Sequence, residues 1–303
     1  MTKLYTLKQI LEKADGHGYA IGSFSARYTP FITPILRAAE ARRSPVIVQI
    51  AQIELHWYDL TLAEFARQFW LQLEDVQPSV PVCLHLDHTQ PFELITEAID
   101  LGFTSVMIDA SAQALAGNIA ATRQVVDYAH ARGVSVEGEL GRIGTTDHME
   151  TENDEELYTD PAEAQTFVDQ TQVDALAISV GTAHGQYLVK QPTIDLARIQ
   201  AIRARTPVHL VLHGGSGTPA DQIHNAIRLP GGGISKVNIA TDLELALLAE
   251  LGRTERLTDA GLRALPAAVI ERGQRAVQTL VEDKIDNFLL SNGHAADFNL
   301  IKG

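Results

Sequence analysis

Three histidines stand at or just past the ends of short apolar runs, and their side chains are of a type that binds zinc. They are His88, His184 and His213. Three imidazoles with an open fourth position are typical of a catalytic rather than a structural zinc site. Taken singly, each histidine has an alternative interpretation as a hydrogen-bonded core residue. Their matching position in three separate runs favours a shared metal.

Acidic residues lie beside these histidines or on a neighbouring run. Asp87 precedes His88 and can act as a general acid or base if its pKa is suitably tuned. The alternative is a carboxylate that orients an imidazole ligand. Glu137 and Glu139 are two residues apart, so they share one face of a strand. Buried carboxylates need a cation or hydrogen bonds, and for Glu137 we favour a structural hydrogen-bond network.

Glycine-rich turns with hydroxyl side chains follow two later runs. Gly214, Gly215 and Ser216 come after one run, and Thr241 comes after the next. Glycine allows close approach of the backbone, and the hydroxyl groups add donors. Backbone N–H groups in such turns bind phosphate. We therefore expect a phosphate-binding site here.

Eight short apolar runs alternate with amphipathic segments, which predicts βαβ units and a parallel sheet. Eight units in a chain of 303 residues favour an α/β fold of the (β/α)8 TIM barrel type over an open doubly wound sheet. The barrel would gather the polar residues at the carboxyl ends of its strands. The predicted strands are Tyr19–Phe24, Pro45–Ile50, Pro81–Asp87, Ser105–Asp109, Ser135–Gly141, Ala175–Gly181, Val208–Gly214 and Ile234–Ala240.

Helices are predicted between these strands and after the last one. The C-terminal segment Leu262–Asn292 is expected to form extra helix outside the barrel or at a subunit contact. We find no linker, so residues 1–303 are interpreted as a single domain. The helices predicted between strands include Pro34–Arg43, Pro91–Leu101, Asn118–Arg132, Pro161–Thr171 and Leu196–Arg205.

A long polar stretch at residues 142–160 interrupts the alternation. It contains several acidic residues, and charged runs are often solvated loops. Because it follows directly on the run that carries Glu137 and Glu139, the alternative is a mobile loop over the active site.

Composition limits which partners the protein is expected to bind and in which compartment we expect it. The net charge of −14 and the pI near 5.2 argue against nucleic acid and against an anionic membrane surface, since both attract basic proteins. The only cysteine is Cys83, so no intrachain disulfide can form. We find no signal peptide and no run long enough to span a membrane. These features predict a cytoplasmic protein.

At this point the motifs resemble those of the class II, zinc-dependent ketose-bisphosphate aldolases, with the tagatose-bisphosphate branch the most similar. The resemblance extends from about Tyr19 to Thr241, in order and with matching spacing. It rests on His85-Leu-Asp-His88, Glu137-Gly-Glu-Leu-Gly-Arg-Ile-Gly144, Gly181-Thr-Ala-His-Gly185, Leu212-His-Gly-Gly-Ser-Gly217 and Lys236-Val-Asn-Ile-Ala-Thr241.

The resemblance implies a role for each matching residue. Zinc would be bound by His88, His184 and His213, and Asp87 would exchange the proton of the C4 hydroxyl group. Asp109 and Glu139 match positions of a second metal or of groups that orient the ligands. A monovalent cation, Na⁺ or K⁺, often lies beside the phosphate in this family. The residues that would hold dihydroxyacetone phosphate are Gly185, Gly214, Gly215, Ser216, Asn238, Ile239, Ala240 and Thr241.

The implied reaction is reversible cleavage of a ketose 1-phosphate or 1,6-bisphosphate to dihydroxyacetone phosphate and an aldehyde, through a metal-stabilised enediolate. We expect a homodimer or homotetramer, with an accessory subunit as an open alternative. Two other functions were weighed. A metal-dependent barrel hydrolase typically has a His-x-His motif after its first strand, which this sequence lacks there. A non-catalytic sugar-phosphate-binding or partner subunit would be favoured by loss of Asp87 or of a metal histidine, and all are present.

Departures from the family pattern concern the proton donor and the far end of the substrate. Asp147 stands near the position of a longer acidic residue, so its proton-transfer role is a hypothesis. The C-terminal stretch that often lies near a distal phosphate is replaced by Leu262-Arg-Ala-Leu-Pro266. Arg27, past the first strand, is an alternative anion-binding group. We therefore hypothesise a ketose 1-phosphate whose far end is not the usual 6-phosphate.

Overall fold

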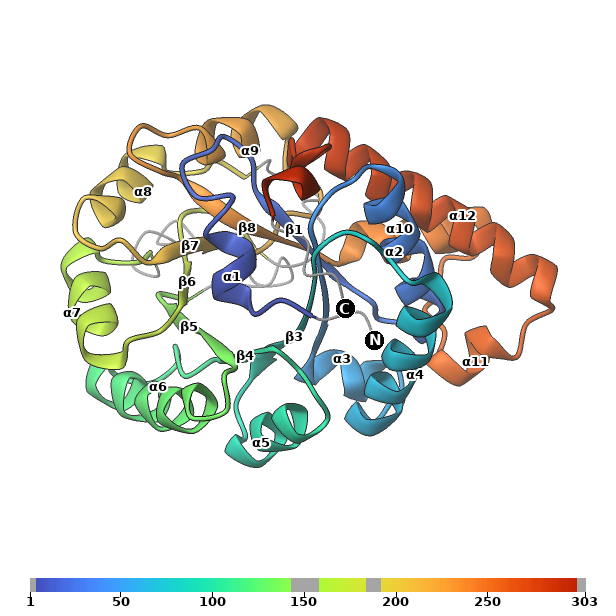
Figure 1. Cartoon of the computed structure of the whole chain (residues 1–303), viewed down its shortest axis with the longest axis horizontal. Coiled ribbons are helices and arrows are strands. Elements are labelled where there is room, and N and C mark those ends of the chain that lie inside the picture. Colours follow the sequence, from blue (N-terminus) through green and yellow to red (C-terminus); the bar gives the residue numbers. More distant parts are fainter. Residues whose placement is uncertain (1–3, 143–157, 184–191, 299–303) are drawn as a thin grey trace.

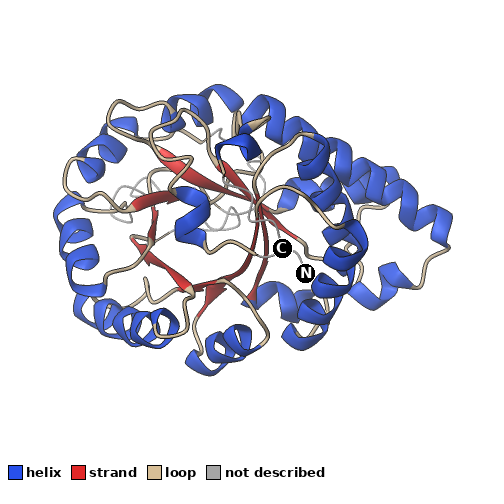
Figure 2. Ribbon diagram, in the orientation of Figure 1, coloured by secondary structure: helices blue, strands red, loops and turns tan. Residues whose placement is uncertain are grey.

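The computed structural model describes residues 4–142, 158–183 and 192–298. Eight parallel strands form a closed barrel in the order β1 to β8 (Figures 1 and 2). The predicted TIM barrel is therefore confirmed. The strands are β1 Ile21–Ser25, β2 Val46–Ala51, β3 Val82–Thr89, β4 Ser105–Ile108, β5 Ser135–Leu140, β6 Ala175–Ile178, β7 His209–Leu212 and β8 Ile234–Ile239.

Each of the eight predicted strands is present, and two of them end more than one residue earlier than expected. β6 stops at Ile178 and β7 at Leu212. Gly181 and Gly214, which the predictions had included, have φ values of 106° and 70°. Such values lie outside the β region, so the backbone turns away from the barrel there. β7 thus ends directly before His213, and the turn at Gly214 follows this residue.

Helices surround the barrel (Figure 2). The five helices named from the sequence between the strands are present as α2, α5, α6, α7 and α8, and α1, α3, α4, α9 and α10 were not among those named. The helices are α1 Leu7–Leu11, η1 Thr29–Phe31, α2 Ile32–Ala41, α3 Gln52–Trp57, α4 Leu62–Val76, α5 Phe92–Asp100, α6 Leu115–His130, α7 Pro161–Thr171, α8 Leu196–Arg203, α9 Ala220–Ile227, α10 Thr241–Glu250, α11 Asp259–Arg263, α12 Ala267–Asp283, η3 Lys284–Phe288 and η4 His294–Asp297.

Alternation along the strands separates two apolar cores. Outward-facing residues such as Val48, Leu84 and Val106 pack under the helices in the larger core. Inward-facing residues at the strand starts form a second core with Leu7 and Ile10 of α1. α1 therefore packs against the start of the barrel interior, which leaves the opposite, carboxyl end for polar side chains.

The C-terminal segment is helical, as predicted, but it is not one continuous helix. α11 ends at Arg263, and Pro266 is the N-cap of α12. Proline is tolerated at a helix start and not in a helix interior, which explains the break. α12 packs along α2 and α10 on the outside of the barrel (Figure 1). In the described residues, no helix is both long enough and apolar enough to cross a membrane.

Candidate active site at the carboxyl end of the barrel

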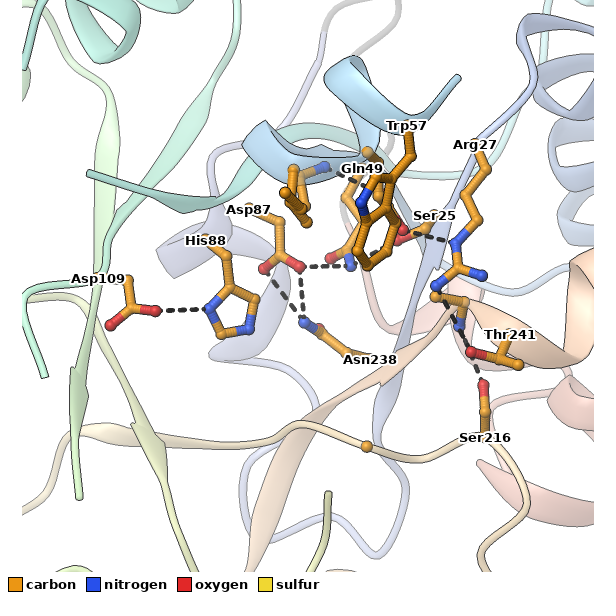
Figure 3. Close-up of a pocket in the computed structure, with 15 residues that line it drawn as sticks. Ser25, Arg27, Gln49, Trp57, Asp87, His88, Asp109, Ser216, Asn238 and Thr241 are labelled. Carbon is orange, nitrogen blue, oxygen red and sulfur yellow. Dashed lines mark hydrogen bonds and ion pairs between the residues drawn. The ribbon is translucent and has the colours of Figure 1, made fainter. Parts of the chain in front are cut away.

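A β-bulge in β3 brings two neighbouring residues into one pocket. Leu86 pairs with Val106 of β4, and the next pair is Thr89 with Ile108. Asp87 and His88 thus oppose a single residue of β4, and His88 has a φ of 33°. Alternation would otherwise point them to opposite faces of the sheet, whereas a bulge redirects a side chain. Both residues line a pocket of about 270 Å³ (Figure 3).

The imidazoles of His88 and His213 converge. His88 Nε2 lies 2.6 Å from His213 Nδ1, and the rings are almost perpendicular. Two unprotonated ring nitrogens repel at this distance unless a proton or a cation lies between them. Ligand atoms of Asp87, His88 and His213 all lie within 4.8 Å of one another. His184, the third predicted ligand, lies outside the described residues.

The outer nitrogen of each imidazole meets a carboxylate. His88 Nδ1 lies 3.0 Å from Asp109 Oδ2, and His213 Nε2 lies 2.9 Å from Glu137 Oε1. A carboxylate that accepts a hydrogen bond from one ring nitrogen leaves the other nitrogen unprotonated for a metal. These contacts support an orienting role for Asp109, one of its two predicted roles.

Glu139 supplies an unsatisfied acceptor at the same place. Its Oε2 atom is buried, has no hydrogen-bond partner among the described residues, and lies 3.6 Å from His88 Nδ1. Burial raises the pKa of Glu139 to about 8, against the opposing effect of the His88 charge. A buried carboxylate oxygen that accepts no hydrogen bond is costly, and a divalent cation would remove the cost. The donor set therefore fits a metal.

A charged layer lies beneath these ligands. Lys236 Nζ donates to Glu137 Oε2 at 2.8 Å and lies 3.5 Å from His85 Nε2. All three side chains are fully buried. Burial opposes ionisation of Glu137, but the Lys236 charge together with His213 and His85 outweighs burial and holds the pKa of Glu137 at about 2. This is the hydrogen-bond network that we favoured for Glu137, and it places His85 in the barrel interior, below the pocket.

Asp87 is held by two amide side chains, one from the adjacent strand β2 and one from β8. Gln49 Nε2 donates to Oδ2 at 2.9 Å, and Asn238 Nδ2 lies 3.1 Å and 3.2 Å from the two carboxylate oxygens (Figure 3). Burial works against its ionisation, but the His88 charge and other neighbours hold the pKa of Asp87 well below its usual range. Asp87 is therefore an oriented, ionised carboxylate. The sequence had suggested Asn238 as a substrate ligand, and its contact here is with Asp87.

The predicted phosphate loops meet at the other end of the pocket. Gly214, Ser216, Ala240 and Thr241 all line it. Ser216 Oγ accepts hydrogen bonds from the backbone N–H groups of Ala240 and Asp242, which ties the two loops together. A Cβ atom at Gly214 would lie 2.2 Å from the carbonyl oxygen of Ala183, so only glycine fits at this position.

Of four other predicted site residues, two are described but do not line the pocket, and two lie outside the described residues. Gly215 donates its N–H group to Asn238 O, and Ile239 packs in the core between strands and helices; neither lines the pocket. Gly185 and Asp147 lie outside the described residues. Most of the predicted 142–160 loop lies outside them as well.

Arg27 is buried and ion-paired. Its Nε atom lies 2.7 Å from Glu54 Oε1, and Nη1 lies 2.9 Å from Glu244 Oε2. Its Nη2 atom lies 3.5 Å from Thr241 Oγ1 (Figure 3), which places the guanidinium beside the predicted phosphate loop. The sequence had suggested Arg27 as an anion-binding group for the far end of the substrate. Two carboxylates now offset its charge.

One wall of the pocket was not predicted from the sequence. α3 was not predicted, because it is only six residues long and its pattern is not clearly amphipathic. Its Ile53 and Trp57 line the pocket together with Ala51, at the end of β2. No motif marks these residues, and only the fold brings them beside Asp87.

Comparison with known proteins agrees with this geometry. The family model described as fructose-bisphosphate aldolase class-II matches residues 5–294. The fructose-bisphosphate aldolase of Geobacillus stearothermophilus is 37% identical over 299 residues, covering 97% of this chain and 99% of its own. That of Giardia intestinalis is 34% identical over 319 residues, covering 98% and 96%. The crystal structure of the YdjI aldolase from Escherichia coli K12 superposes with a TM-score of 0.79 at 29% identity, covering 97% and 100%.

Proposed function

Because the chain belongs to the class II fructose-bisphosphate aldolase family, we propose that it is a zinc-dependent enzyme whose product is dihydroxyacetone phosphate. Family membership supports an aldolase that cleaves a phosphorylated ketose. The metal, the product and the aldehyde half are our proposal. We also propose a cytoplasmic location, a homodimer or homotetramer, a single domain and a likeness to the tagatose-bisphosphate branch.

The observation that carries the proposal is that one site combines the carboxylate of Asp87, two converging imidazoles and glycine-rich loops of the kind that bind phosphate. His88 and His213, with His184, would hold the zinc ion, and Asp109 and Glu137 would orient the two described imidazoles. When bound, zinc supplies a Lewis acid for the oxygen atoms at C2 and C3. Glu139 Oε2 lies 4.0 Å from His213 Nδ1, the nitrogen that would bind the zinc ion.

Asp87 is the base in this proposal. It takes the proton of the C4 hydroxyl group, the C3–C4 bond breaks, and the C4 oxygen becomes the carbonyl oxygen of the aldehyde. The electron pair stays with the three-carbon fragment, and a proton then adds at C3 to form dihydroxyacetone phosphate. Gln49 and Asn238 keep the carboxylate of Asp87 aimed at this proton. The proton for C3 is assigned to Asp147 on the ground of the sequence alone.

The phosphate of the three-carbon fragment is assigned to the loops of Gly214, Ser216 and Thr241. Backbone N–H groups and hydroxyl groups bind phosphate without a net charge of their own. Arg27 Nη2 lies on this side of the pocket and adds a hydrogen-bond donor, although Glu54 and Glu244 offset its charge. Binding here fixes C1 to C3 relative to Asp87, which is the orientation that catalysis requires.

The experiment is condensation of dihydroxyacetone phosphate with a panel of aldehydes by the zinc-loaded protein. We expect formation of a ketose 1-phosphate. The same enzyme should cleave ketose 1-phosphates with a higher kcat/KM than fructose or tagatose 1,6-bisphosphate. A tenfold preference for a bisphosphate, about 1.4 kcal/mol of transition-state binding, would overturn the hypothesis about the far end and leave the aldolase assignment intact.

A further inference from the structure

Two large apolar side chains on α3 are left half-exposed inside the pocket. Ile53 is 47% exposed and Trp57 is 45% exposed, and both line the cavity that contains Asp87. They are four residues apart and therefore lie on the same face of the helix. Single exposed apolar residues are common, but a paired apolar surface within a pocket is typical of a ligand-binding wall.

This apolar wall, formed by Ile53 and Trp57, is held in place. Glu54, between them in sequence, accepts a hydrogen bond from Ala51 N at 3.0 Å and pairs with Arg27 at 2.7 Å. The guanidinium carbon of Arg256 lies 4.9 Å from the centre of the Trp57 ring. α3 and the indole are thus fixed before a ligand arrives, which lowers the entropic cost of binding.

The other parts of the pocket already have roles in the proposed function, on which this inference rests. The imidazoles and Asp87 act at C2 to C4, and the glycine-rich loops hold the phosphate on C1. The part of the substrate beyond C4 is left facing α3. We propose that Ile53 and Trp57 bind this tail, and that the released aldehyde carries an uncharged tail that presents C–H groups.

The charges around the wall support an uncharged tail. In the part of the chain that the structure describes, Arg27 is the only arginine or lysine that lines the pocket. Its charge is shared with Glu54 and Glu244, and Glu244 also pairs with Arg256. Two guanidinium groups thus face two carboxylates, and their formal charges cancel. The wall presents the side chains of Ile53 and Trp57 and neither the glycine-rich loops nor the charged donors that hold a phosphate. An aromatic ring, in contrast, packs well against C–H groups.

The two tryptophans of the chain allow a direct binding test. Trp70 on α4 does not line the pocket, and its Nε1 atom donates to Leu101 O at 3.0 Å. A zinc-loaded Trp70→Phe variant therefore has Trp57 as its only indole. We expect fructose 1-phosphate, which has an uncharged tail, to change its fluorescence in a saturable way. Dihydroxyacetone phosphate, which lacks the tail, should change it little, and the matched Trp57→Phe variant should respond to neither.

Kinetics separate the tail from the rest of the site. Trp57→Ala should lower kcat/KM for condensation with glyceraldehyde at least tenfold, and Ile53→Ala should lower it less. Exchange of the C3 proton of dihydroxyacetone phosphate, which needs no aldehyde, should stay within twofold. Trp57→Phe should retain most of the condensation activity, and Trp70→Ala should change neither rate.

Three outcomes would overturn the inference. One is an equal loss of exchange and condensation in Trp57→Ala, which would make the wall merely structural. Another is a higher kcat/KM for glyceraldehyde 3-phosphate or for a carboxylate-tailed aldehyde than for glyceraldehyde. The third is unchanged Trp57 fluorescence at saturating fructose 1-phosphate. In contrast, a zinc-loaded parent enzyme that shows no C3 exchange at all would contradict the proposed function itself.

Discussion

Asp87 and His88 are consecutive in the chain, yet both of their side chains line one pocket (Figure 3). The bulge in β3 and the φ of 33° at His88 allow this arrangement. A non-glycine residue in that region of φ is uncommon and is typical of functional sites. The backbone of β3 thus places the proposed acid/base group and the proposed metal ligand side by side.

Asp87→Ala should retain zinc but lose carbon–carbon cleavage by about a hundredfold or more, as expected for a positioned acid/base group. His213→Ala, which removes a ligand, should lose both zinc and activity. Zinc content by elemental analysis and steady-state cleavage rates measure the two effects. If Asp87→Ala lost its metal and recovered turnover when zinc was added back, Asp87 would be a ligand-orienting group instead.

Chelation should abolish cleavage, and zinc should restore it, because the described histidines and carboxylates form a donor set that fits a divalent cation. Borohydride added with substrate should trap no covalent adduct on Lys236, whose Nζ atom is buried and paired with Glu137. Mass spectrometry of the intact protein checks this. Full activity in a demonstrably metal-free sample would refute the assignment.

Gly214→Ala should impair both stability and phosphate binding, because its Cβ atom would lie 2.2 Å from a backbone oxygen. Gly133→Ala is the matched control, since Gly133 also has a positive φ of 71° but no atom within 4 Å of a Cβ atom. The control should cost only about 1–2 kcal/mol of backbone strain. Chemical denaturation and the KM for dihydroxyacetone phosphate measure the difference, and equal behaviour of the two variants would contradict it.

Lys236→Met should lower the free energy of unfolding by about 3–5 kcal/mol, because it leaves Glu137 buried without its cationic partner. Adding Glu137→Gln should recover part of the loss. Arg123→Ala, which breaks the exposed Arg123–Asp127 pair, should cost less than about 1 kcal/mol. Urea denaturation of the metal-free proteins compares all three, and a Lys236→Met variant as stable as the parent would argue against the buried pair.

Asp147→Ala should slow exchange of the C3 proton of dihydroxyacetone phosphate while leaving its binding nearly intact. This prediction rests on the sequence, in which Asp147 belongs to the polar stretch that follows the Glu137–Gly141 run. Proton exchange followed by NMR and a separate binding titration test it. Equal exchange rates in the variant and the parent would remove Asp147 from the mechanism.

Several features of this protein were determined by the sequence itself. The alternation of apolar runs and amphipathic segments predicted the eight strands of the barrel, because strand and helix periods are local properties of the chain. The spacing of Asp87, His88 and His213 relative to the strand ends predicted that they would meet. A closed barrel brings the carboxyl ends of all strands to one rim, so a strand-end position is enough to predict proximity.

The tertiary structure decided which neighbours those residues meet. Period-two alternation would have separated Asp87 from His88, and only the bulge unites them. The packing of α3 and α10 over the rim decides two further features. One is the pairing of Arg27 with Glu54 and Glu244, and the other is the wall of Ile53 and Trp57. Contacts between segments far apart in sequence arise from packing and from pairing of charges on burial. No local pattern encodes these contacts, so the sequence alone could not show them.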